Sequence, residues 1–353
     1  MYDIVIVGAG PAGATLARLI GSKYKVLLID KRDMENENPK KIKNKCCGGL
    51  LAPDAQKMIA QLGLGIPKDI LVNPQLFAVR TLDLNNNLER LYQRFYFNMD
   101  RDKFDQWLIS IIPNEVDKRL NAYFKSFTEI SGGYEISYIY NGQEILAKTK
   151  IIVGADGASS KIRKLIAEDI SSPEKYISIQ EWYECTEYTP YFTAIFDEEI
   201  SDFYSWVIPK DNYLLLGSAL RPREDTWNKY NLLKAKLIKL GFTFENKFKT
   251  EGAYINRPKR GSQLYGGKDN IALVGEAAGA ISPSSAEGIS YALKSSLYLA
   301  QSLEEGIDGF LDRYNQRIKG IRLNLLIKNL KSPAMYNPFL RQLAMKSGLQ
   351  SIR

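Results

Sequence analysis

The feature that most constrains this chain is a glycine-rich turn that follows its first apolar run. Residues 2–7 are typical of a buried strand, the turn Gly8-x-Gly10-x-x-Gly13 comes next, and residues 14–20 continue as a helix. In such a turn the first glycine permits a tight bend, the second lets the backbone approach a pyrophosphate, and the third lets the helix pack closely on the strand. The helix N-terminus presents free N–H groups and a partial positive charge to the phosphates. We therefore expect a dinucleotide-binding unit at this point.

A second apolar run, residues 25–30, ends in an acidic side chain. Asp30 lies twenty residues beyond Gly10, where its carboxylate can accept hydrogen bonds from a ribose diol. This fingerprint alone does not separate FAD from NAD(P). Because no second Gly-x-Gly-x-x-Gly occurs, we expect no separate nicotinamide-binding domain.

Two later segments repeat the order of strand, glycine turn and helix. Residues 151–153 lead into Gly154, and residues 271–274 lead into Gly275-Glu276. The later turn can place an acidic side chain near a ribityl or pyrophosphate group. The helix that begins after Gly288 can direct its positive end at a reduced flavin. Both turns are also compatible with ordinary connections between a strand and a helix.

The order of these runs predicts the architecture. Buried-strand runs occur near the start, the middle and the end of the chain, while residues 176–220 hold short aromatic strands. We expect an α/β fold with a discontinuous Rossmann-like domain, an inserted antiparallel β-sheet substrate domain and a C-terminal helical tail. The polar residues 31–45 are predicted to form a surface loop. The expected domains are residues 1–70, 98–170 and 262–305 for cofactor binding, 71–97 and 171–261 for the substrate, and 306–353 for the basic helical region.

The chain has 353 residues and no histidine. This excludes Ser-His-Asp and Cys-His nucleophiles and any metal site that needs imidazole, so acid–base work falls to Asp, Glu, Lys, Tyr or Cys. The three cysteines, Cys46, Cys47 and Cys185, cannot form a disulfide framework and fit a reducing intracellular setting. We see no signal peptide and no apolar run of about 18 to 20 residues. A cytoplasmic enzyme or binding protein without a metal is expected.

Positive charge is concentrated in the C-terminal tail. The net charge is +8, from 48 Lys plus Arg against 40 Asp plus Glu, and residues 313–353 hold nine basic residues and no acidic one. The pattern fits either an amphipathic helix on an anionic membrane surface or a helix docked on the protein with a solvated basic face. We expect a peripheral membrane contact in the first case, and no nucleic acid partner. The apolar positions are Ile318, Ile321, Leu325, Leu326 and Leu330, with Lys319, Arg322, Lys328 and Lys331 between them.

Six segments, taken in order, resemble one family. They are GAGPAG at 8–13, KCCGGLL at 45–51, RDKFDQWL at 101–108, GADGASSKIR at 154–163, YSWVIP at 204–209 and GEAAGAISPSSAEGISYAL at 275–293. The set resembles the geranylgeranyl reductase family of FAD-dependent oxidoreductases, which has the p-hydroxybenzoate hydroxylase-type flavoprotein fold. The resemblance runs from residue 1 to about residue 300, and the last fifty residues match no motif of the family.

The resemblance implies FAD as the cofactor and assigns residues to its parts. Glu276 stands where the family usually has Asp, so its contact can be shifted or water-mediated. The loop with Cys46, Cys47 and Gly49 would run along the flavin. The remaining assignments are Gly8, Gly10, Ala12 and Gly13 for the pyrophosphate, Asp30 and Lys31 for the adenosine ribose, Arg101 for the phosphate or ribose side, Phe124 for adenine, Gly275 with Glu276 for the ribityl or pyrophosphate side, and Gly288 and Ile289 for the isoalloxazine.

The resemblance also implies three reacting or substrate-facing side chains. Cys47 would lie near the reactive face of the flavin, where its thiol can donate a proton; alternatively it is a small buried residue. The segment Tyr204-Ser-Trp206-Val-Ile208-Pro resembles the Tyr-x-Trp-x-Phe-Pro cavity segment of the family. Alternation along a strand places Tyr204 and Trp206 on one face, either toward an apolar substrate or as a core pair.

Three functions remain open. The first is reduction of carbon–carbon double bonds in an isoprenoid or lipid-like substrate by hydride transfer from reduced FAD, with NAD(P)H or a ferredoxin-like carrier as electron donor. The second is a flavin-dependent monooxygenase or halogenase for an aromatic substrate, although Tyr204 breaks the Trp-x-Trp-x-Ile-Pro pattern of halogenases. The third is a non-enzymatic flavin-binding protein at the membrane surface. Cys47 and the Tyr-x-Trp segment favour the first over the second.

Overall fold

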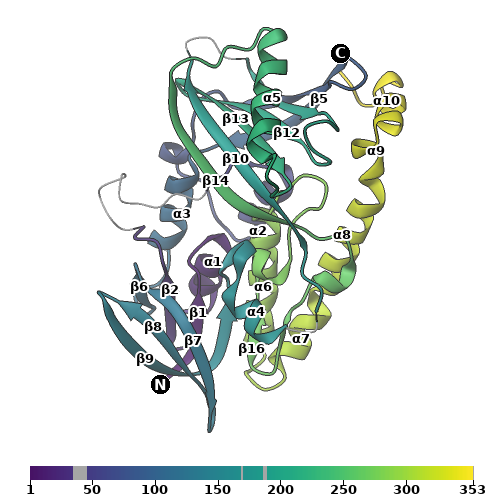
Figure 1. The fold of residues 1–353 in the computed structure, drawn as a ribbon. Helices are drawn as coiled ribbons and strands as arrows, with labels where there is room; N and C mark the ends of the chain where they lie inside the picture. The colour runs from purple at the N-terminus through teal and green to yellow at the C-terminus, as the bar shows by residue number, and fades with distance from the viewer. Residues whose placement is uncertain (35–45, 168–169, 186–188, 353) are drawn as a thin grey trace.

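The computed structural model describes residues 1–34, 46–167, 170–185 and 189–352. Two large β-sheets lie at opposite ends of the molecule, with most of the helices between and beside them (Figure 1). Residues 35–45, which make up most of the loop predicted at 31–45, lie outside the described residues.

The first sheet is built from segments distant in sequence, as predicted. Its order is β15-β16-β9-β1-β2-β6, and from β16 to β6 the neighbours pair in parallel. In the central strand β1, Val5 lies opposite both Leu27 of β2 and Ile152 of β9. Parallel strands covered on both faces favour near-continuous apolar runs. The strands are β1 (Tyr2–Val7), β2 (Val26–Asp30), β6 (Asp117–Leu120), β9 (Gln143–Gly154), β15 (Gly267–Lys268) and β16 (Ile271–Leu273), and the antiparallel strands β7 (Tyr123–Ile130) and β8 (Gly133–Tyr140) extend the sheet through β9.

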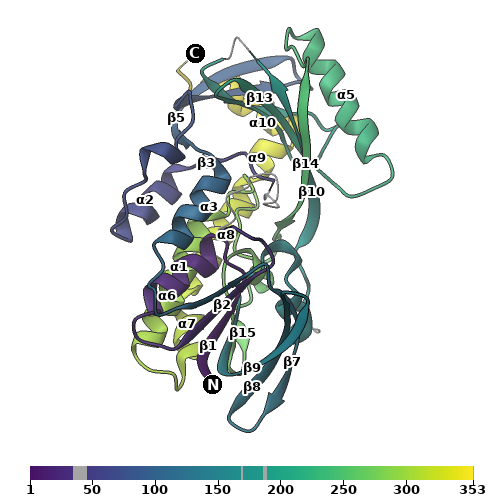
Figure 2. The same ribbon diagram turned by 90° about the vertical axis from the view of Figure 1, so that its left-hand side faces the viewer.

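Three helices lie side by side against this sheet (Figure 2). Helix α1 (Pro11–Ile20) follows the glycine turn and starts with proline, whose missing N–H has no intrahelical partner to lose. Helix α6 (Ile289–Glu304) packs against α1, and so does α3 (Arg101–Ser110). The side chain of Asp100 caps α3 by accepting the first free backbone N–H groups. The sheet, α1, α3 and α6 therefore carry all the motifs assigned to a cofactor except the cysteine loop.

The second sheet has the order β14-β10-β13-β12-β11-β4-β5-β3. Its strands pair antiparallel as predicted, except that β11 runs parallel to β4. Because the chain passes through the first sheet between β4 and β11, it supplies the long connection that parallel neighbours require. Helix α5 (Thr226–Lys239) covers one face of the sheet through Tyr230, Leu233 and Leu237. The strands are β3 (Leu50–Leu51), β4 (Leu76–Asp83), β5 (Leu88–Asn98), β10 (Glu174–Glu184), β11 (Tyr191–Phe196), β12 (Ser205–Lys210), β13 (Tyr213–Leu220) and β14 (Lys247–Arg257).

The opposite face of the second sheet carries an aromatic cluster. Its rings come from β10, from β11, from the segment around β12 and from the C-terminal region, and they contact one another in tilted, stacked and edge-to-face pairs. Such pairs add to the stability that apolar burial already provides. The members are Tyr176, Phe196, Phe203, Tyr204, Trp206 and Tyr336.

The C-terminal region runs along the molecule from the first sheet to the second (Figure 1). It consists of α7 (Phe310–Arg317), α8 (Lys319–Lys331), α9 (Pro333–Tyr336) and α10 (Pro338–Lys346). Ile318, Ile321 and Leu325 are buried, whereas Leu326 is 40% and Leu330 is 81% exposed. The five apolar positions therefore do not form one face: three dock on the protein and two face solvent. Among the helices in the described ranges, none is long and apolar enough to cross a membrane.

Candidate functional site

The three glycines of the first turn have different surroundings. Gly8 has a φ of +107°, and an added Cβ would collide with the backbone of Ala155. An added Cβ at Gly13 would collide with the carbonyl oxygen of Gly8, so both glycines are required by packing. Gly10 has an ordinary φ of −71°, and within the described residues an added Cβ would lie within 4 Å of one atom beyond its chain neighbours, Nη2 of Arg32 at 3.8 Å. Because described residues leave this position at the N-terminus of α1 uncrowded, it fits a pyrophosphate.

Asp30 lies at the end of β2 and is tied to the glycine turn. Its Oδ2 accepts a hydrogen bond from the backbone N–H of Ala9 at 2.6 Å, and its Oδ1 accepts one from the backbone N–H of Arg32 at 2.7 Å. The Arg32 guanidinium also pairs with Asp30, with Nε 3.2 Å from Oδ1. The carboxylate therefore holds the turn in place, and a ribose diol would share it with these donors.

Behind Arg32 lies a buried chain of charged groups. Arg32 Nη1 donates to Asp105 Oδ2 at 2.9 Å, and Arg101 Nε donates to Asp105 Oδ1 at 2.8 Å. Burial alone would raise the pKa of Asp105, but the two guanidinium groups outweigh it and hold the pKa below its usual value. These ion pairs link the glycine turn to the first turn of α3, where Arg101 was expected to reach the cofactor.

Lys31 and Phe124, the two further residues expected near the adenosine, lie in different environments. Lys31 is exposed to solvent. Phe124 lies on β7 and is partly buried against the core of the first sheet. The chain just before it bonds to the end of β2, since Ala122 N–H donates to the carbonyl oxygen of Asp30 at 2.8 Å. The strand that carries Phe124 therefore begins beside the end of β2. Among the described residues, Arg32 rather than Lys31 pairs with Asp30.

The late glycine turn packs directly on the early one. Gly275 has a φ of +59°, and an added Cβ would lie 3.0 Å from the Cβ of Ala12. The hydroxyl of Ser296 on α6 donates to the carbonyl oxygen of Ala12 at 2.7 Å. Glu276 is engaged elsewhere, because its Oε1 accepts the backbone N–H of Asn256 at 2.8 Å. Gly275 thus meets the glycine turn, while Glu276 holds the end of β14.

Helix α6 begins directly after Gly288. The carboxylate of the preceding Glu287 accepts the backbone N–H of Ser290 at 2.7 Å and also its hydroxyl. Burial raises the pKa of Glu287. Ile289 is 8% exposed and forms the first residue of the helix. The N-terminus of α6 is therefore held by a half-buried carboxyl group, and the positive end of the helix dipole suits a partial negative charge.

The cysteine loop, residues 46–49, connects the two sheets. Cys46 is buried against the second sheet, with its Sγ 3.6 Å from the Oγ of Ser178, and burial raises the pKa of its thiol to about 12. Cys47 is half-buried, accepts the backbone N–H of Gly49 at 3.5 Å, and interacts with the side chain of Arg101. The two thiols are not joined in a disulfide, and they contact different surroundings: Cys46 contacts Ser178 and Cys47 contacts Arg101.

Lys210 is a buried cation beside the cysteine loop that the sequence motifs did not identify. It ends β12, is 4% exposed, and its Nζ donates to the carbonyl oxygens of Gly49 and Met99, each at 2.8 Å. Burial lowers the pKa of its ammonium group to about 7, although the charge of Cys47 acts to raise it. A lysine that closes the otherwise apolar segment YSWVIPK was the available signal. The side chain fixes the loop and holds a transferable proton near it.

Tyr204 and Trp206 share one face, as strand alternation predicted. Their ring centroids lie 5.4 Å apart. The hydroxyl of Tyr204 donates to the carbonyl oxygen of Ser285 at 2.7 Å, and burial raises its pKa. Tyr204 therefore joins the second sheet to the loop that precedes α6.

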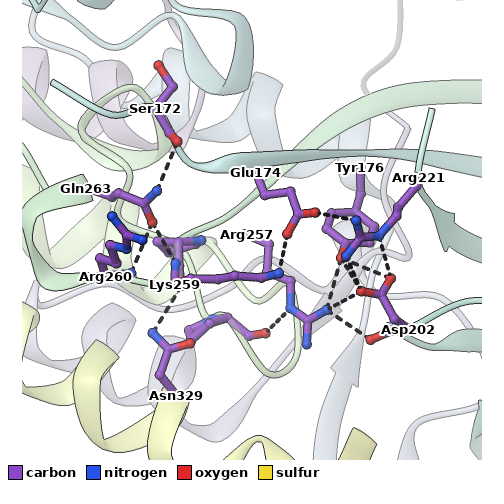
Figure 3. A network of polar contacts seen from close by, with 12 residues as sticks. Ser172, Glu174, Tyr176, Asp202, Arg221, Arg257, Lys259, Arg260, Gln263 and Asn329 are labelled. Atoms are coloured by element: carbon purple, nitrogen blue, oxygen red, sulfur yellow. Dashed lines mark hydrogen bonds and ion pairs between the residues drawn. The ribbon is translucent and has the colours of Figure 1, made fainter. Parts of the chain in front are cut away.

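A second polar network holds the same loop from the other side. Arg257 is buried beneath the aromatic cluster and donates to the carbonyl oxygens of Pro283 and Asp202 at 3.1 and 2.9 Å, and to the hydroxyl of Tyr176 (Figure 3). Its guanidinium lies 4.6 Å from the ring centre of Tyr336. The network ties the second sheet, the loop before α6 and the C-terminal region into one unit.

Sequence comparison finds full-length relatives. Over 351 residues the chain is 37% identical to protein CbrA of Escherichia coli strain K12, with 99% of this chain and 98% of the relative covered. Protein CbrA of Shigella sonnei gives the same identity, again over 99% of this chain and 98% of that protein. No family model matches the chain.

Solved structures share the fold. A geranylgeranyl bacteriochlorophyll reductase-like protein from Thermoplasma acidophilum has a TM-score of 0.78 at 18% identity, over 97% of this chain and 90% of that one. A triple mutant of the flavin-dependent brominase Bmp2 has a TM-score of 0.70 at 18% identity, over 97% and 94%. The probable FAD-dependent monooxygenase pqsL from Pseudomonas aeruginosa has a TM-score of 0.70 at 15% identity, over 98% of both chains. The α/β flavoprotein fold expected from the resemblance is confirmed.

Proposed function

The chain belongs to the CbrA family, and from that premise we propose that it is an FAD-dependent oxidoreductase that reduces carbon–carbon double bonds. The substrate we propose is an apolar isoprenoid or lipid-like molecule. One arrangement carries the proposal: the cysteine loop contacts both candidate halves of the site. Cys47 interacts with Arg101, which is linked through Asp105 to Arg32 beside the glycine turn. Cys46 contacts Ser178 on the aromatic face of the second sheet.

The first sheet supplies the residues that would hold FAD. The backbone around Gly10 would face the pyrophosphate, and Asp30 with Arg32 would lie on the ribose side. The N-terminus of α6 offers free N–H groups and a positive dipole end to a reduced isoalloxazine. When bound, reduced FAD supplies a hydride to the double bond.

The second hydrogen of the product arrives as a proton, which the protein must provide. With no histidine in the chain, Cys47 is the proposed donor. Arg101 and Lys210 flank its loop, and the pKa of Lys210, lowered to about 7 by burial, lets that side chain return a proton near neutral pH. Saturation of one double bond thus uses one hydride and one proton and leaves the side chains unchanged after re-protonation.

The aromatic face supports an apolar substrate. Trp206 and Tyr204 lie on the side of the second sheet that the cysteine loop covers, together with Phe196 and Phe203. Aromatic rings bury large apolar areas with little loss of side-chain freedom. The reductase-like neighbour also superposes with a higher TM-score, 0.78, than the brominase, 0.70.

Mass spectrometry of a solvent extract from the purified protein tests the proposal. FAD together with an isoprenoid or another lipid is the expected result. Anaerobic turnover of that compound, with NAD(P)H or a reduced ferredoxin as the donor, should then yield a product two mass units heavier per saturated bond. Absence of FAD after gentle purification would contradict the proposal at its first step.

A flavin-dependent monooxygenase or halogenase is the second candidate, because a brominase and a monooxygenase share the fold over nearly the whole chain. The two candidates differ in their need for oxygen. A product that gains an oxygen or halogen atom only in air would replace the reductase proposal. Bound FAD that turns over neither kind of substrate would favour the non-enzymatic flavin-binding alternative.

We further propose that the C-terminal region meets an anionic membrane surface where such a substrate resides. Leu323, Ile327 and Leu330 recur at helical spacing on α8 and are 60%, 41% and 81% exposed. Phe339 on α10 is 65% exposed. Lys319 and Lys331 accompany them, and residues 313–353 carry no acidic side chain. Exposed apolar residues among cations are the composition of helices that lie in a membrane interface.

A further inference from the structure

Two buried side chains on the second sheet have polar atoms without partners. Gln180 on β10 is 1% exposed, and among the described residues neither its Oε1 nor its Nε2 has a hydrogen-bond partner. Trp206 on β12 is 6% exposed, and its Nε1 is likewise unpartnered within the described ranges. Burying an amide or an indole N–H without a hydrogen bond is unfavourable, so native proteins rarely retain such groups without a partner.

The sheet register places these groups next to each other. Gln180 lies directly opposite Gly217 of β13, and Gly217 lies directly opposite Trp206. Directly opposed residues share a face of the sheet. An added Cβ at Gly217 would collide with Nε1 of Trp206, which shows that the indole lies across this position. Because Gly217 has no side chain, the indole of Trp206 can lie over it, and its N–H comes next to Gln180 on the neighbouring strand.

This is the face that the cysteine loop covers. Ser178, two residues before Gln180 on the same face, contacts Cys46. Ile208, two residues after Trp206, would lie 2.8 Å from a Cβ added at Gly48. Gln180 and Trp206 therefore lie beneath the loop that carries Cys47, on the side proposed to receive the substrate.

The chemistry of the three atoms selects an uncharged oxygen. The Gln180 amide nitrogen and the Trp206 indole nitrogen donate, and the Gln180 oxygen accepts. Glu251 lies directly opposite Gln180 on β14, with its carboxylate bonded to Trp182 at 2.9 Å and to Lys249 at 3.0 Å. Because the Lys249 ammonium is already paired with the Glu251 carboxylate, the pair brings no net positive charge to attract an anionic ligand. A hydroxyl or carbonyl oxygen satisfies the donors without bringing a charge.

We propose that Gln180 and Trp206 bind an uncharged oxygen atom carried by the substrate. The substrate is then an oxygenated isoprenoid or lipid, an alcohol or a carbonyl compound, rather than a pure hydrocarbon. The bound oxygen fixes the position of the chain, and so selects which double bond reacts. This inference rests on the proposed function and narrows its substrate class.

The test uses three probes with the same carbon chain: geranylgeraniol, the corresponding aldehyde geranylgeranial, and the tetraene hydrocarbon that lacks the oxygen. Each is titrated into the FAD-loaded protein, and binding is followed by the change in flavin absorbance. We expect the oxygenated probes to bind about tenfold more tightly than the hydrocarbon, since the hydrocarbon leaves buried polar groups unpaired. A hydroxyl group can form hydrogen bonds with all three atoms, whereas a carbonyl oxygen can accept only from the two donors. The ratio of the dissociation constants of the alcohol and the aldehyde therefore shows which oxygen group the site prefers.

Matched variants separate the proposed role from a general effect on packing. Gln180→Leu and Trp206→Phe should each reduce the preference for the oxygenated probes several-fold while FAD stays bound. Thr193→Val is the control, because Thr193 is also fully buried with an unpartnered hydroxyl but lies on the α5 face, opposite Val207. It should leave the preference unchanged. Gln180→Leu should also raise the melting temperature, since it removes an unpaired buried amide.

Equal binding of the three probes by the natural chain would overturn the inference. That result is expected if water, rather than an oxygen of the substrate, bonds to Gln180 and Trp206. Binding of none of them, or a lower melting temperature for Gln180→Leu, would overturn it as well. Failure of the proposed function looks different: the protein would lack FAD or would reduce no double bond. A protein that holds FAD and reduces the hydrocarbon as readily as the alcohol keeps its function and loses only this inference.

Discussion

At the scale of single residues, Gly10 differs from the glycines on either side of it. Its φ is compatible with any residue, and in the part of the chain that the structure describes no backbone atom crowds the position of a Cβ, so Gly10→Val should fold with little loss of stability. The added side chain would fill the space proposed for the pyrophosphate. We expect a stable protein that retains less than about a tenth of the FAD of the natural chain, measured by the flavin absorbance of the purified protein.

Gly8→Ala is the matched contrast. Its φ of +107° and the collision with Ala155 predict poor folding rather than a selective loss of cofactor. Circular dichroism and thermal unfolding separate the two outcomes. Full FAD occupancy in Gly10→Val would show that the turn does not approach the cofactor.

Lys210 predicts a dependence of stability on pH. Burial lowers its pKa to about 7 in the folded protein from 10.5 in the unfolded chain. Between these values the unfolded state binds more protons, so the free energy of unfolding rises with pH by up to about 1.4 kcal/mol per pH unit. Lys210→Met lacks this contribution. Denaturant unfolding of both proteins from pH 7 to 10 should show the natural chain gaining stability relative to the variant. A difference in the free energy of unfolding that stays constant over this range would show that the pKa of Lys210 is not lowered.

These residues show what a sequence motif can and cannot predict. The glycine turn was predictable because its conformation follows from local sequence, and Gly8 and Gly13 have the predicted steric roles. Arg32, Gln180 and Lys210 were not, because their environments depend on side chains distant in sequence. Arg32 bonds to Asp105, and Lys210 bonds to carbonyl groups more than a hundred residues away.

At the scale of elements, helix α10 is attached to β4 by a buried ion pair. Arg341 Nη2 lies 2.8 Å from Asp83 Oδ1, with side-chain exposures of 5% and 0%. Arg341→Met should lower the free energy of unfolding by about 3 kcal/mol, because it leaves the carboxylate buried without its cation. Burial alone would raise the pKa of Asp83, but Arg341 and Asn86 hold it below its usual value. The stabilisation is therefore present at neutral pH and is lost as the pH falls through the lowered pKa.

Denaturant unfolding at pH 7 and near pH 3 measures both effects. The difference between the natural chain and Arg341→Met should shrink at the lower pH. Adding Asp83→Asn to the variant should recover part of the loss, since no unpaired charge remains. The same loss in the double variant would mean that packing of the Arg341 side chain, rather than charge, carries the stability.

The sequence patterns predicted where strands form more accurately than how those strands pair. The aromatic runs between residues 176 and 220 form strands, as their composition indicated. The parallel pairing of β11 with β4 was not predictable, since it depends on how the chain returns from the first sheet. In α8, helical spacing was predicted correctly, but which apolar residues are buried was decided by neighbours such as Leu264 and Pro258, whose carbonyl oxygens accept from Arg322 and Asn329.

At the scale of the whole molecule, the chain combines a nearly neutral body with a basic end. Outside residues 313–353 there are 39 basic and 40 acidic residues, so this part has a charge of −1 and the C-terminal residues carry +9. The discontinuous first sheet was predictable from its buried-strand runs. The closure of the aromatic cluster by Tyr336 was not, because the last fifty residues match no motif of the family that the rest of the chain resembles.

That charge distribution predicts binding to anionic vesicles through the C-terminal region. The full chain should sediment with vesicles that contain phosphatidylglycerol at low ionic strength and release as salt screens the attraction. The double variant Leu330→Glu, Phe339→Glu should bind at least several-fold more weakly, since it places acids among the exposed apolar residues of α8 and α10. The double variant Leu146→Glu, Leu165→Glu is the matched control, because it adds the same two charges at side chains outside the C-terminal region that are 61% and 44% exposed. Equal loss in the control would indicate a response to net charge alone, and unchanged binding in the double variant would mean that α8 and α10 do not form the contact.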